Sequence, residues 1–232
     1  MYLSQYIAQA GVCSRRNAID FIKNGFVEVN GKKIVVVSCK VEHDDVIKLK
    51  GKILKLERKI YILLNKPKNY VTTTSDEQGK NNVINLVKLS KKERLYPVGR
   101  LDKNTTGLLL LSNDGDLTLK LTHPKNQIKK VYHAVLDQPL THEDFIKIKK
   151  GVRLREGKFF ADKIFYKSSK SKKDIIVEIH SGKKRIIRRL FNAVGYNVIK
   201  LDRMAYAFLT KKGLPIGRWR FLLHKEVKQL KS

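Results

Sequence analysis

Apolar and polar residues alternate with helical spacing at the start of the chain. Over 3–10 the apolar positions fall on one face of a short helix, which Gly11 can end. A second helix is expected between Ser14, which suits an N-cap, and Gly25, which suits a stop. The chain therefore begins with two short helices.

Strand patterns follow this helix pair. Valines alternate with polar residues over 26–34, and Asn30-Gly31 suits the positive φ angles of a tight hairpin turn. The segment 45–50 predicts another strand. We therefore expect residues 1–50 to form one compact domain, followed by a basic linker at 51–59.

Residues 60–232 alternate between strand and helix patterns and are expected to form one larger domain. Thr141 begins a capping box that predicts a helix ending at Gly151, and a turn is expected over 113–116. The remaining pattern predicts strands at 60–64, 107–112, 174–180, 198–209 and 218–223 and a basic helix at 184–194. Helices and strands mixed around one sheet indicate an α+β fold.

The net charge of the chain indicates a class of binding partner. The 232 residues include 50 Lys and Arg against 21 Asp and Glu, which gives a formal net charge of +29. Residues 1–60 carry 12 against 6 of these, and the rest carry 38 against 15, so both domains are basic. A lysine-rich genome is one explanation, but a polyanion such as nucleic acid is the favoured partner.

Other classes receive little support from the sequence. Apolar runs are too short to span a membrane, and the first residues do not read as a signal peptide, so a cytoplasmic protein is expected. Cys13 and Cys39 have no metal-binding spacing, and no metal is expected. The sequence also lacks the motifs of nucleotide hydrolysis, hydride transfer and DNA-binding fingers.

Asp102 is a candidate catalytic residue because of its neighbours in the sequence. Asp102 lies between Arg100 and Lys103, in a loop that leads into the apolar strand 107–112. Neighbouring cations favour an ionised carboxylate, which suits a nucleophile or an electrostatic stabiliser. From spacing alone, an ordinary surface ion pair is the favoured interpretation.

The first domain resembles the S4 RNA-binding domain. The resemblance rests on LSQYIAQAGVCSRRNA, which begins at Leu3, and on GFVEVNGKK, which begins at Gly25. It implies a small S4-like (αL) fold that binds structured RNA through basic residues. Arg15 and Arg16 fit this role, because the first turn of a helix disfavours cations and their presence there needs a reason.

The second domain resembles the ribosomal RNA pseudouridine synthases that act on the small subunit, together with types B, E and F of those that act on the large one. Four stretches carry the resemblance in order: LNKPKNYVTT from Leu64, GRLDKNTTGLLLLSNDGD from Gly99, KKVYHAV from Lys129 and SGKKRIIRRLF from Ser181. A leading S4 domain is also usual in this group. The pattern is most similar to the type B branch of the large-subunit enzymes, although Ile186-Ile187 and the ending at 211–220 depart from the usual motifs.

This resemblance implies a fold, a reaction and a site. The fold would be a mixed, mainly antiparallel sheet with flanking helices, and the reaction would isomerise uridine to pseudouridine in ribosomal RNA, without a cofactor. Asp102 matches the essential aspartate, which acts on a flipped-out nucleotide at C1′ or by steering proton removal at C2′. Tyr132 matches the tyrosine that lies against the base, for stacking or proton transfer, and Arg188 matches the arginine that pairs with the aspartate.

Contacts to RNA are expected from basic residues in both domains, and a monomer acting on large-subunit rRNA is the default expectation. A non-catalytic S4-type RNA-binding or ribosome-assembly factor is the alternative. The residues expected to bind RNA are Arg15, Arg16, Lys23, Lys32, Lys33, Lys66, Arg100, Lys130, Lys184, Arg185 and Arg189.

Overall fold

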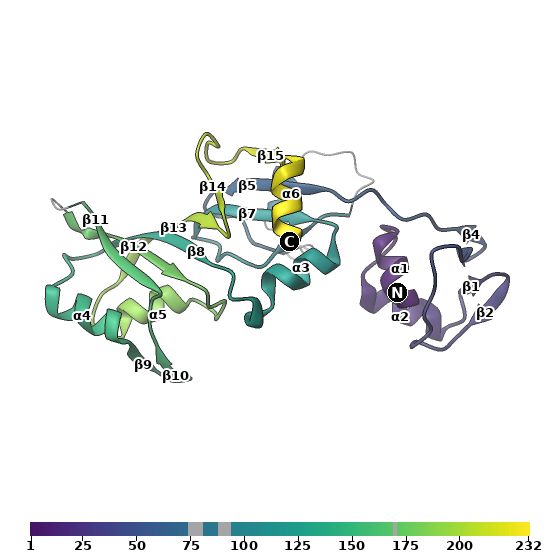
Figure 1. The fold of residues 1–232 in the computed structure, drawn as a ribbon, viewed down its shortest axis with the longest axis horizontal. Helices are drawn as coiled ribbons and strands as arrows, with labels where there is room; N and C mark the ends of the chain where they lie inside the picture. Colours follow the sequence, from purple (N-terminus) through teal and green to yellow (C-terminus); the bar gives the residue numbers. More distant parts are fainter. Residues whose placement is uncertain (74–80, 88–93, 169–170) are drawn as a thin grey trace. The chain divides into compact units, whose positions relative to one another are not determined.

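The computed structural model describes residues 1–73, 81–87, 94–168 and 171–232 (Figure 1). The chain divides into two compact units. The first contains Met1–Ile60 together with Asn113–Gly115 and residues 94–95, and the second contains the other described residues from Tyr61 onward. Each unit has a sheet and a core of its own.

The first unit packs two helices against a small sheet. Helix α1 runs over Leu3–Gln9 and α2 over Arg15–Lys23, and the strands are arranged in the order β2-β1-β3-β4. Leu3, Ile7 and Ile22 are fully buried in the core between them. The four strands are β1 Val27–Val29, β2 Lys32–Ile34, β3 Ile47–Leu49 and β4 Lys52–Ile53.

Local signals in the sequence explain the ends of these elements. The Ser14 side chain accepts a hydrogen bond from the backbone N–H of Asn17, as expected of an N-cap. At the hairpin between β1 and β2, Asn30 and Gly31 have φ angles of 51° and 78°, which the turn requires. The stretch 51–59, expected as a linker, includes β4, which pairs with β3.

The second unit is built on a nine-stranded sheet. Its main path runs β11-β12-β8-β13-β7-β5-β15, with β14 beside β13 and β6 beside β7. Only β13 and β7 run parallel among the paired strands described here, so the expected mixed, mainly antiparallel sheet is confirmed. These strands are β5 Tyr61–Lys66, β6 Tyr96–Val98, β7 Thr106–Ser112, β8 Lys130–Leu136, β11 Lys163–Ser168, β12 Ser171–Ile179, β13 Val198–Tyr206, β14 Leu209–Thr210 and β15 Trp219–Phe221.

Helices and a hairpin complete this unit (Figure 1). The β9–β10 hairpin is a separate two-stranded sheet. No helix within the described ranges is long and apolar enough to cross a membrane. The elements are α3 Gly115–Thr122, α4 His142–Lys150, α5 Ile186–Asn192, α6 His224–Lys231, the 3₁₀ helices Val83–Leu86 and Pro124–Asn126, β9 Val152–Leu154 and β10 Gly157–Phe159.

Two of these helices differ from the sequence-based expectation. Helix α3 begins at Gly115, inside the turn predicted over 113–116, and buries Leu117 and Leu121. At the other end of the chain, α6 buries Leu230 in the same core. Both helices are short, so tertiary packing rather than a long periodic pattern stabilises them.

The parallel junction between β7 and β13 brings two distant segments unusually close. Gly107 has a φ angle of 103°, and a Cβ placed there would lie 2.3 Å from the backbone oxygen and 2.5 Å from the backbone nitrogen of Arg203. Only glycine allows this approach. Because Gly107 follows the loop that carries Asp102, the junction places that loop beside β13.

Candidate active site

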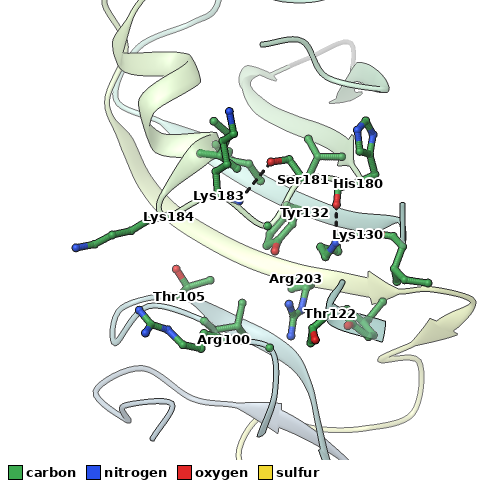
Figure 2. A pocket seen from close by; sticks show the side chains of 18 of the residues that line it. Arg100, Thr105, Thr122, Lys130, Tyr132, His180, Ser181, Lys183, Lys184 and Arg203 are labelled. Carbon is green, nitrogen blue, oxygen red and sulfur yellow. Dashed lines mark hydrogen bonds between the residues drawn. The ribbon is translucent and has the colours of Figure 1, made fainter. Parts of the chain in front are cut away.

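A pocket of about 740 Å³ opens in the second unit, next to the parallel junction (Figure 2). Its volume lies in the range of small-molecule sites. Its walls come from the Asp102 loop, the end of α3, β8, the segment before α5, and β13. The pocket therefore gathers side chains from three of the four stretches that carry the resemblance, and adds side chains from α3 and β13.

Asp102 lies at this pocket and forms an ion pair. Its Oδ2 atom is 3.6 Å from Nη1 of Arg185, and its side chain is 32% exposed. Arg185 is the N-cap of α5 and has a left-handed φ of 53°. Its side chain is 51% exposed, so solvent weakens the attraction, and the pair aims the carboxylate more than it stabilises the fold.

Arg188 does not make the pairing expected of it. Its Nη1 donates to the backbone carbonyl of Val198, and its buried Nε has no hydrogen-bond partner among the described residues. Burial lowers the pKa of Arg188, the positive charge of Arg185 adds to this effect, and Asp102 opposes it. Arg188 thus makes no ion pair with Asp102, and Arg185 makes it instead. One helical turn separates them, and the cap position is the one that reaches the carboxylate.

Tyr132 forms part of the pocket wall on β8. It is 8% exposed, and its strand neighbours are Val177 on β12 and Arg203 on β13. Figure 2 shows its ring directed into the space above Arg203. An aromatic ring fixed between two strands offers a rigid stacking surface for a planar ligand.

Lys66 corrects one of the RNA-binding predictions. It is fully buried, and its Nζ donates to the backbone carbonyls of Pro67, Lys103 and Thr105 at 2.9, 3.1 and 2.8 Å. Burial lowers the pKa of Lys66 to about 8, with the negative charge of Asp102 acting in the opposite direction. All three protons of the Lys66 ammonium are donated to backbone carbonyls, and Lys66 does not line the pocket, so it has no donor left for RNA. Instead it holds the loop on the C-terminal side of Asp102.

Thr72 holds the other side of the same loop. Its Oγ1 donates to the backbone carbonyl of Leu101 at 2.7 Å and accepts from the Leu101 N–H at 3.2 Å. The backbone N–H of Thr105 also donates to the carbonyl of Asp102 at 3.0 Å. Asp102 is therefore fixed from both sides by segments far away in the sequence, as preorganised chemistry requires.

Lys130 and Tyr206 line the pocket near β8 and β13. The Nζ of Lys130 donates to the carbonyls of Ile128 and His180 at 2.6 and 2.7 Å. Burial lowers the pKa of Lys130 to about 8, the nearby Arg203 adds to this, and Asp162 opposes it. Tyr206 donates its hydroxyl to the carbonyl of Leu121, and burial raises its pKa to about 12, so it stays neutral.

Sequence reasoning missed Arg203 and Tyr206. Both lie on β13 in the strand expected over 198–209, and both line the pocket. The signal that could have singled out Arg203 is its place two residues after Leu201, on the same face of the strand, because charged groups are rarely buried without a purpose.

The other expected RNA-binding residues occupy varied environments. Arg100, Lys184 and Arg185 are exposed around the pocket, whereas Arg189 pairs with Glu156. The five residues of the first unit that are expected to bind RNA are all exposed. The guanidinium of one of them, Arg15, lies 5.7 Å from the centre of the Tyr2 ring. Over the described ranges, no three His, Cys, Asp or Glu side chains come together as a possible metal site.

Comparison with known proteins gives matches along most of the chain. Residues 3–47 match the family model of the S4 domain, and residues 60–193 match that of RNA pseudouridylate synthase. The chain is 42% identical to ribosomal large subunit pseudouridine synthase B of Bacillus subtilis over 233 residues, covering 99% of the chain and 95% of the relative. It is 34% identical to the dual-specificity RNA pseudouridine synthase RluF of Escherichia coli, covering 97% and 76%.

Solved structures agree with these matches. The crystal structure of a pseudouridylate synthase superposes with a TM-score of 0.70 at 25% identity, and the match covers 99% of both chains. The similarity therefore extends over both units and the segments that line the pocket.

Proposed function

The chain belongs to the RNA pseudouridylate synthase family, and we propose that it converts a specific uridine of large-subunit ribosomal RNA into pseudouridine. The observation that carries this proposal is the convergence of the Asp102–Arg185 ion pair and the Tyr132 ring on one pocket. The choice of large-subunit RNA rests on the 42% identity to a ribosomal large subunit enzyme.

The pocket suits a nucleotide taken out of its stack. A base within duplex RNA cannot reach a recessed carboxylate, so enzymes that act on a base extrude it and recover the cost through stacking and polar contacts. In the proposed complex the uracil lies against Tyr132, and the ribose faces Asp102 at the mouth. Exposed Arg100 and Lys184 lie at this mouth, where they can bind the flanking phosphates.

The proposed reaction conserves every atom of the nucleotide. The N1–C1′ bond breaks with its electron pair remaining on the base, the ring turns, and a C5–C1′ bond forms. The proton lost from C5 is balanced by one gained at N1, so nothing is oxidised or reduced. Asp102 acts either at C1′ or on the proton at C2′, and both roles need a carboxylate held in place, which Arg185 and the tethered loop provide.

The first unit supplies a second contact to the RNA in this proposal. Its exposed basic residues can track a phosphate backbone, and neutralising each phosphate releases counterions. The S4 match over residues 3–47 supports this role. The residues assigned to it are Arg15, Arg16, Lys23, Lys32 and Lys33.

Mapping of ribosomal RNA tests the proposal directly. RNA from cells with and without the protein is treated with carbodiimide and read by primer extension, which should reveal one pseudouridine that depends on the protein. Purified Asp102→Asn should bind the same RNA within about twofold and form no pseudouridine, because the carboxylate is lost and the basic contacts remain. Asp44→Asn, which alters a fully exposed carboxylate, is the matched control.

Two outcomes would contradict the proposal. Identical pseudouridine maps from the two kinds of cell, together with retained RNA binding, would favour a non-catalytic RNA-binding or ribosome-assembly factor. Full activity of Asp102→Asn would remove Asp102 from the mechanism.

A further inference from the structure

Arg203 is buried at the pocket without an acidic partner. It is 2% exposed, and none of the ion pairs in the described part of the chain includes it. Its neighbour Asp202 is already engaged by Lys211 and Thr106. A buried guanidinium normally pairs with a carboxylate or fills its hydrogen bonds in another way, so this one needs an explanation.

Only part of the guanidinium is satisfied. Its Nε donates to the carbonyl of Leu108 at 2.6 Å, and its Cζ lies 4.8 Å from the centre of the Tyr206 ring. Its Nη2 is buried and has no hydrogen-bond partner among the described residues. The hydroxyl oxygen of Thr105, which also lines the pocket, is likewise buried without a partner in the described part of the chain. Leaving such donors unpaired is costly for a fold, and functional sites are where this cost is tolerated.

The backbone holds Arg203 rigidly on both sides. On one side it is paired in register with Tyr132 of β8, and on the other it abuts Gly107 of β7. Its side chain lines the same pocket as Tyr132, and Figure 2 draws it below that ring in the view. A donor fixed in this way needs no rearrangement to meet a ligand, which is what makes electrostatic stabilisation effective.

We infer that Arg203 donates to a carbonyl oxygen of the flipped-out uracil and stabilises the negative charge that the base acquires when the glycosidic bond breaks. This inference rests on the proposed function. The electron pair of the N1–C1′ bond is delocalised onto the ring oxygens and is used again when C5 bonds to C1′. Arg203 transfers no proton in either step.

The deep position of Arg203 in the pocket favours the base, rather than the RNA backbone, as its ligand. Arg203 is almost wholly enclosed, so only a group fully inside the pocket reaches it. The phosphates stay on the strand at the mouth, where the exposed cations lie. Tyr132, the strand neighbour of Arg203, offers the stacking face for the same ring.

Substitution of Arg203 tests the inference in the full-length protein. Arg203→Met should slow single-turnover pseudouridine formation about 100-fold, the effect typical of removing one preorganised donor. Its affinity for the same RNA with an abasic target nucleotide should stay within about twofold of the wild type. Arg203→Lys keeps the positive charge but loses the planar guanidinium, and it should form pseudouridine about tenfold more slowly than the wild type. This variant tests the inference if Arg203→Met does not fold. Arg220→Met, which removes an arginine that pairs with Glu226, is the control.

The outcomes separate this inference from the proposed function. A rate within twofold of the wild type would overturn the role of Arg203. A slower rate matched by an equal loss of affinity for abasic RNA would also overturn it, because Arg203 would then act through the fold. If the wild type itself forms no pseudouridine, the proposed function fails. Affinities for RNA with uridine and with an abasic target would still show whether Arg203 contacts the base.

Discussion

Replacement of Lys66 by methionine separates the stability of the fold from the placement of Asp102. The substitution keeps an unbranched side chain of similar length and removes three hydrogen bonds to backbone carbonyls, two of which belong to the Asp102 loop. It also removes a buried charge. These two changes act in opposite directions on the free energy of unfolding, and pH distinguishes them.

The pKa of Lys66 falls from 10.5 to about 8 in the folded protein. The unfolded state therefore binds more protons than the folded state between these values, so stability from this residue rises as pH increases through that window. Taken alone, this pKa shift increases the free energy of unfolding by about 2.5 kcal/mol between pH 7 and pH 10. The three carbonyls favour the ammonium and reduce this figure, so we expect about 1 to 2.5 kcal/mol.

Urea unfolding followed by circular dichroism measures this effect. The wild type should gain stability relative to Lys66→Met by that amount between pH 7 and pH 10, because methionine does not titrate. Single-turnover pseudouridine formation by Lys66→Met at pH 7 should fall about 100-fold, since the Asp102 loop loses its tether. Lys68→Met alters an exposed lysine two positions away and should leave both quantities unchanged. A stability difference that does not change with pH would refute the reasoning.

Three further predictions concern other contacts. Arg185→Gln should slow catalysis about fivefold, which corresponds to about 1 kcal/mol for a half-exposed ion pair. If Arg188→Gln slows catalysis more than Arg185→Gln does, then Arg188 rather than Arg185 orients Asp102. Joint substitution of Arg15 and Arg16 by alanine should reduce the slope of log affinity against log salt by about 1.5 in filter-binding titrations, and an unchanged slope would make them solvated surface residues. Gly107→Ala should lower the unfolding temperature by about 10 °C in calorimetry, because the new Cβ would collide with Arg203; an unchanged temperature would contradict that contact.

Much of the local structure could be predicted from the sequence. The Ser14 cap, the Asn30-Gly31 turn and the Thr141 cap each depend on contacts within a few residues, and each is present in the structure. Such features are encoded locally, so the residue types alone identify them. The resemblance then predicted the sheet, whose order depends on contacts far apart in the sequence.

The less predictable features depend on tertiary placement. Lysine is a residue type expected at an exposed RNA contact, and only the packed loop around Lys66 shows that it is buried. Arg185 and Arg188 lie one helical turn apart, and the left-handed cap decides which of them reaches Asp102. The unpaired donor of Arg203 cannot be read from sequence, because it depends on what β7 and β8 leave unsatisfied.

The parallel junction of β7 and β13 also sets the order in which the protein is built. The first unit closes its core with contacts among residues 1–60, so it can fold while the rest of the chain is still being synthesised. The pocket cannot exist until β13 has been made and docked beside Gly107, a pairing that joins distant segments and is slow to form. A nascent chain therefore acquires the unit matched to RNA binding well before it acquires the pocket, and a ribosome that releases the chain early yields a product that lacks the pocket.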